Sequence, residues 1–91
     1  MIIVDFHEYG PVAPRTIDPH ELREIYRGCR AMMAEFEPDH IQELLEDWEI
    51  ALAWSSTDGA PVAADWYTRA LVVMCLRGLR GERAPVWRTR G

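Results

Sequence analysis

Two pairs of histidine and glutamate have a spacing that could bind a metal ion. His20 and Glu24 stand four residues apart, and His40 and Glu43 stand three apart, so a helix would place each pair on one face. Such pairs on helices are usually solvated, and each histidine otherwise stands alone in a loop or at a helix start. We therefore expect no metal site and no cofactor.

The possible nucleophiles are two cysteines and two serines. Cys29 and Cys75 fall on apolar helix faces, with no histidine beside either in the sequence, and burial raises the pKa of a thiol, which disfavours a nucleophile. Ser55 and Ser56 lie in an interhelical segment that has no strand-turn-helix elbow. The glycines do not have the spacing of a phosphate-binding loop. We expect no catalytic residue and no enzyme, and buried free thiols favour a cytoplasmic location.

Charge is distributed unevenly along the 91 residues, whose net charge is −5. Residues 1–49 hold twelve acidic residues against four arginines, and residues 50–91 hold three against six. Every arginine maps to a polar helix face, a loop or the tail, which disfavours a buried site for a small anionic substrate. The arginine-rich tail around Trp87 could stack on single-stranded nucleic acid. Three arginines on an acidic chain would bind it weakly, so nucleic acid is not the expected partner.

Two features argue against a membrane protein. The longest apolar run, residues 70–76, is far short of the roughly 20 residues that span a bilayer. The N-terminal residues lack the basic leader of a secretory signal.

Three amphipathic periods, each opened by a cap or a proline, predict an all-α fold, a small three-helix bundle with helices near 19–36, 38–54 and 61–78. Asp18 is a good N-cap, Pro19 suits the first helical position, and apolar residues then recur with a 3.6-residue period. Pro38 and Pro61 open the next two helices, and Gly78 or Gly81 can end the third. The chain is expected to be a single helical domain, with arm and loop at 1–17, core at 18–80 and a polar tail at 81–91.

The N-terminal arm, residues 2–6, is β-branched or aromatic and predicts one short strand or an extended segment. A lone strand would have no partner within the chain. It would lie across the helices or pair with another molecule, and residues 7–17 would form a loop.

The third predicted helix is apolar nearly all round. Tyr67, Leu71 and Met74 complete a core stripe, yet further apolar residues share the opposite arc with charged ones. The arm could fold over this second face, or the face could be an interface, since exposed apolar patches usually mark interaction sites. We predict an interface for a second copy or another protein, formed with the tail by Trp66, Val72, Val73, Leu76, Leu79, Val86 and Trp87.

The second predicted helix has a weaker apolar feature. Ile50 and Trp54 project from the face that carries Glu43, Glu46 and Asp47, unless Trp54 tucks under the following loop. The expected function is that of a non-enzymatic, protein-binding regulator or inhibitor that sequesters a partner protein. The alternatives are a self-associating assembly factor or structural subunit and, third, a small all-α dimeric enzyme.

Overall fold

The computed structural model describes residues 1–56, 61–82 and 87–89, the last three through their backbone alone. The elements follow in the order β1 (Ile2–Val4), η1 (His7–Tyr9, a short 3-10 helix), β2 (Arg15–Ile17), α1 (Pro19–Glu35), α2 (Pro38–Ser55), α3 (Ala64–Leu79) and β3 (Trp87–Thr89). The all-α, three-helix arrangement predicted from the sequence is confirmed.

The helix boundaries follow from local chemistry. The side chain of Asp18 accepts a hydrogen bond from the backbone N–H of His20 at 2.8 Å, and Pro19 occupies the first turn of α1. Pro38 likewise stands in the first turn of α2. Gly81 has a φ of +75°, the left-handed conformation that commonly follows the last turn of a helix. The third helix begins at Ala64 rather than at Pro61, because Ala63 is still extended.

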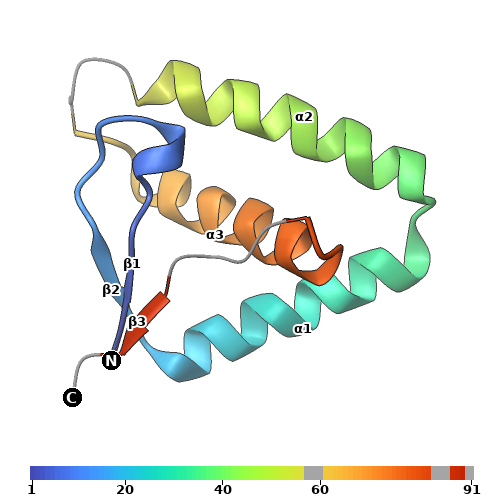
Figure 1. Cartoon of the computed structure of the whole chain (residues 1–91), viewed down its shortest axis with the longest axis horizontal. Coiled ribbons are helices and arrows are strands. Elements are labelled where there is room, and N and C mark those ends of the chain that lie inside the picture. Colours follow the sequence, from blue (N-terminus) through green and yellow to red (C-terminus); the bar gives the residue numbers. More distant parts are fainter. Residues whose placement is uncertain (57–60, 83–86, 90–91) are drawn as a thin grey trace.

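The third helix is the centre of the fold. In Figure 1, α1 and α2 diverge from their junction, and α3 lies between them. Its buried residues point in nearly every direction around the helix axis, which is typical of a helix covered on several sides. They are Trp66, Ala70, Leu71, Val73, Met74, Cys75 and Leu76.

The prediction that the N-terminal strand has no partner within the chain is wrong. The sheet has the order β2-β1-β3, and both ladders are antiparallel. Ile2 pairs with Ile17 on one side of β1 and with Thr89 on the other. The predicted loop 7–17 therefore contains η1 and β2, and the predicted tail contains β3. Strands of three residues are too short to produce a readable alternation of apolar and polar residues.

Candidate functional site

The predicted interface on α3 is largely core. Trp66 is only 4% exposed, and Val73 and Leu76 are completely buried. Val72 and Leu79 are half-buried and pack against the same core. The expectation that this arc of α3 faces water in the monomer is therefore wrong, because α1, α2 and the N-terminal arm together cover it.

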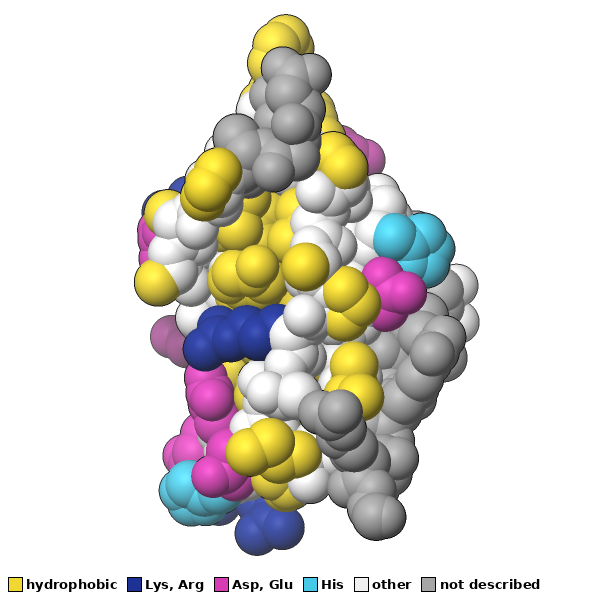
Figure 2. Space-filling model, turned by 90° about the vertical axis from the view of Figure 1, so that its left-hand side faces the viewer, with side chains coloured by type: hydrophobic (Ala, Val, Ile, Leu, Met, Phe, Trp, Pro, Cys, Tyr) yellow, Lys and Arg dark blue, Asp and Glu magenta, His cyan; other side chains and the backbone are white. Residues whose placement is uncertain are grey.

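The arm covers the first turns of α3 through an aromatic cluster. The ring of Phe6 lies 5.7 Å from that of Trp66 and 5.3 Å from that of Tyr67, both in edge-on geometry. The guanidinium of Arg15 lies 5.1 Å from the centre of the Tyr67 ring, within the range of a cation–π contact. Figure 2, which views the end of the molecule that carries the sheet, shows a band of hydrophobic side chains crossed by a basic one.

Two residues of the predicted interface cannot be placed in the same way. Val86 lies outside the described residues, and Trp87 is described only as a backbone position in β3. Their role in partner binding stays a prediction.

Large apolar side chains are exposed instead on α2. Trp54 is 76% exposed and Ile50 is 58% exposed. Together with Glu43 and Asp47 they stand at positions i, i+4, i+7 and i+11, so all four share one stripe along the helix. We call Glu43, Asp47, Ile50 and Trp54 the α2 stripe. This face of the second helix was identified from the sequence. The alternative, in which Trp54 is buried under the following loop, is wrong, because Trp54 is exposed.

The α2 stripe belongs to the most acidic part of the chain. Helix α2 carries five acidic residues and no arginine, whereas the other ten acidic residues are matched by all ten arginines. The net charge of the whole chain, −5, is therefore equal to the charge of α2 alone. One of its five carboxylates, that of Glu49, accepts a hydrogen bond from Arg77 of α3 at 2.5 Å. Glu43 and Asp47 are exposed on the stripe itself.

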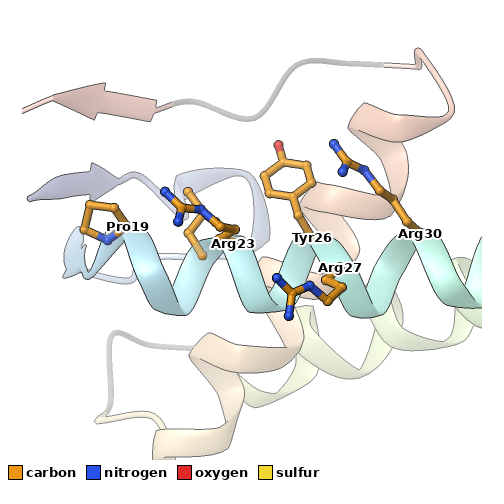
Figure 3. A pocket seen from close by; sticks show the side chains of 6 residues that line it. Pro19, Arg23, Tyr26, Arg27 and Arg30 are labelled. Carbon is orange, nitrogen blue, oxygen red and sulfur yellow. The ribbon is translucent and has the colours of Figure 1, made fainter.

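A second surface feature is a groove of about 410 Å³ along α1, lined by Pro19, Leu22, Arg23, Tyr26, Arg27 and Arg30. In Figure 3, Arg23, Tyr26 and Arg30 extend from the same side of the helix, while Arg27 points away from them. Arg27 pairs with Glu24 at 3.1 Å. Sequence reasoning treated these arginines as an ordinary polar face. Their recurrence every three or four residues around Tyr26 is the signal that could have identified the groove.

The buried interface between α1 and α3 contains both cysteines as free thiols. The Sγ of Cys29 lies 3.8 Å from the carbonyl oxygen of Val72, and Cys75 stands one helical turn further along α3. The two thiols are hydrogen-bonded to each other, and Tyr26 is hydrogen-bonded to Cys75. The bond with Cys29, together with burial, raises the pKa of the Cys75 thiol. The same bond lowers the pKa of Cys29, against the opposing effect of burial.

The three histidines are all exposed. His7 contacts the carboxylate of Asp5 at 2.9 Å on the surface, and the backbone N–H of His20 donates to the Asp18 side chain that caps α1. Within the described ranges, no group of three or more His, Cys, Asp or Glu residues could hold a metal ion.

In the part of the chain that the structure describes, no helix combines the length and the apolarity that crossing a membrane requires. Compared with known proteins, the chain matches no protein-family model, no curated protein and no solved structure.

Proposed function

We propose that this chain is a non-enzymatic, protein-binding module that docks on its partner through the α2 stripe. The observation that carries the proposal is the 76% exposure of Trp54. Tryptophan is enriched among the residues that contribute most to protein interfaces, because its large ring loses contact with water when it enters a pocket. Ile50 lies one turn earlier and extends the apolar area.

The charge of the stripe specifies the chemistry of the partner. Glu43 and Asp47 continue the line of Ile50 and Trp54 toward the start of α2. A complementary surface has an apolar pocket for the tryptophan and basic side chains beside it. Opposite charges steer the encounter and reject acidic surfaces, while the aromatic anchor supplies most of the affinity.

The proposed role is regulatory. Occupying a basic surface with an apolar pocket would sequester the partner from other acidic ligands, which is inhibition by competition. The free, buried thiols support a reducing compartment such as the cytoplasm as the place where this occurs.

An affinity capture with matched variants tests the proposal. Tagged wild-type protein, Trp54→Ser and Glu21→Ser are immobilised at equal density, and bound proteins are compared by quantitative mass spectrometry. Glu21 is an exposed acidic residue on α1 and serves as the control. We expect one protein with a basic surface to bind the wild type and Glu21→Ser and to be lost with Trp54→Ser, while circular dichroism stays unchanged. Equal capture by all three would refute the α2 stripe as the docking surface.

A second copy of the chain is the alternative partner, and the α1 groove is the observation that favours it. Its arginines complement the acidic α2 stripe in charge, and Leu22 and Tyr26 offer apolar surface to an incoming tryptophan. Such a contact makes the protein a homodimer or larger self-assembly, in keeping with a structural or assembly role.

Charge reversal separates the two candidates. If copies associate in this way, Arg23→Glu/Arg30→Glu and Glu43→Arg/Asp47→Arg each weaken association in sedimentation equilibrium, and a chain carrying all four changes regains it. A 10.5 kDa monomer at every concentration and salt tested rules out self-association and leaves the first proposal standing.

A further inference from the structure

We propose that Cys29 and Cys75 are a redox-sensitive pair that hydrogen peroxide, or another small hydroperoxide, converts into a reversible disulfide between α1 and α3. The inference is independent of the partner-binding proposal. It starts from the position of the pair, because two free thiols meet at the packed interface of helices that are far apart in the sequence.

The geometry brings the two sulfur atoms to the same level of the interface. Cys29 donates to the carbonyl of Val72 at 3.8 Å, and a helical carbonyl points toward the residues one turn later, where Cys75 stands. The thiols are hydrogen-bonded to each other. A disulfide requires the sulfurs to approach to roughly 2 Å, and side-chain rotations together with a shift of the helices would have to supply this movement.

The two cysteines have different roles in the reaction. The hydrogen bond to Cys75 lowers the pKa of Cys29 against the effect of burial, which favours Cys29 over Cys75 as the attacking thiolate. Cys75 keeps its proton because of that same bond and its burial, which makes it the resolving thiol. A bulky disulfide oxidant does not fit here, because both side chains are buried.

The reaction balances with one peroxide per protein. The Cys29 thiolate attacks a peroxide oxygen and the O–O bond breaks, which gives a sulfenic acid and a hydroxide that takes up the proton released by Cys29. The sulfur of Cys75 then attacks the Sγ of Cys29. The S–S bond forms, the S–O bond breaks, and the hydroxyl leaves as water with the proton of Cys75. The two thiols lose two electrons, and hydrogen peroxide is reduced to two waters, or an organic hydroperoxide to an alcohol and one water.

The α1 groove is the approach to the pair. Tyr26 lines the groove, is half-buried and interacts with Cys75, so this side chain connects the open surface with the thiol pair. A hydroperoxide would approach the sulfurs by displacing it.

Peptide mapping of peroxide-treated native protein tests the proposal. Cleavage after arginine places Cys29 in the peptide 28–30 and Cys75 in the peptide 70–77. We expect these two peptides to be joined within one chain, to lack two hydrogen atoms, and to separate on addition of dithiothreitol. The oxidised protein should also melt higher by on the order of 10 °C, because the bond closes a long loop.

Single-cysteine variants are the controls. Cys29→Ala and Cys75→Ala should show no rise in melting temperature after peroxide, whereas a rise that persists in either variant would not come from the disulfide and would contradict the assignment. The proposal is overturned if native protein yields no joined peptide and both cysteines label as free thiols after unfolding. It is equally overturned if the bond forms only between two chains.

Discussion

The guanidinium of Arg77 donates a hydrogen bond from Nε to Oε1 of Glu49 at 2.5 Å, which fixes the end of α3 against α2. The two side chains are 11% and 25% exposed, so water screens the pair only partly. The hydrogen bond to Glu49 raises the pKa of Arg77, which keeps the arginine charged across the usable pH range. Arg77 also pairs with Glu82 at 3.4 Å.

Arg77→Met should lower the free energy of unfolding by about 1–3 kcal/mol, because it removes a charged hydrogen bond from the half-buried Glu49 carboxylate. Urea denaturation measures this. The control is Arg69→Met, which removes a 3.5 Å pair with Asp65 whose side chains are 56% and 65% exposed. That change should cost no more than about 0.5 kcal/mol. Equal effects of the two variants would show that burial of the Arg77 pair does not matter.

Truncation of Trp66 should destabilise the fold strongly, whereas truncation of Trp54 should hardly affect its stability. Trp66 is buried, and its Nε1 donates to the carbonyl of Leu52 at 3.1 Å. Trp66→Ala should cost about 3–5 kcal/mol, enough to unfold much of a domain this size. Trp54→Ala should change stability by less than about 0.5 kcal/mol. Thermal melts followed by circular dichroism decide this, and a folded, stable Trp66→Ala protein would contradict the core position of Trp66.

Gly10 and Gly28 form a matched pair for an alanine substitution. Gly10 has a φ of +135°, and an added Cβ would lie 2.0 Å from the Oγ of the buried Ser56. Gly10→Ala should therefore destabilise the fold by about 2–3 kcal/mol. An added Cβ at Gly28, inside α1, meets nothing within 4 Å. Gly28→Ala should instead stabilise the fold by about 0.5–1 kcal/mol. If both variants are destabilised, the space around Gly28 is not open.

Stability should fall at high pH because of Cys75. In the folded chain the bond with Cys29 and burial hold the pKa of Cys75 above its ordinary value of 9.0, so its proton is retained while the unfolded chain releases it. The contribution of Cys75 to the free energy of unfolding is complete below about pH 9. Above that pH it declines by about 1.4 kcal/mol per pH unit. Cys29, whose pKa is lowered, acts in the opposite sense and adds stability as the pH rises toward 9.0.

Urea titrations in reducing buffer at several pH values measure this slope. The chain has no lysine, so its three tyrosines are the main other side chains that lose a proton in this range. In Cys29→Ala/Cys75→Ala the decline should be much smaller, and an identical decline in that variant would assign it to other groups.

The helices were predictable because each begins with chemistry that acts locally. Asp18 and Pro19, or Pro38 alone, specify a helix start without reference to the rest of the chain. The exposed pair Ile50 and Trp54 was visible for a similar reason, since they share a face with acidic residues.

The surroundings of α3 were not predictable, because they depend on how several elements meet. A helical wheel shows that Val73 and Leu76 lie opposite the first core stripe, but not that α1, α2 and the arm cover all sides. The short strands β2 and β3 are specified by their pairing with β1 rather than by their own residues. The meeting of Cys29 with Cys75 likewise depends on tertiary packing, which no spacing in the sequence encodes.

The central position of β1 has a consequence for folding kinetics. Its pairing with β2 closes a short loop, whereas its pairing with β3 joins segments from opposite ends of the described chain. Contacts between distant segments form slowly, because more chain entropy must be lost first. The ladder with β2 can form early, but the other edge of β1 stays open until β3 arrives. During that interval it is a template for strands of other molecules, so the rate of this late step sets the risk of aggregation during refolding.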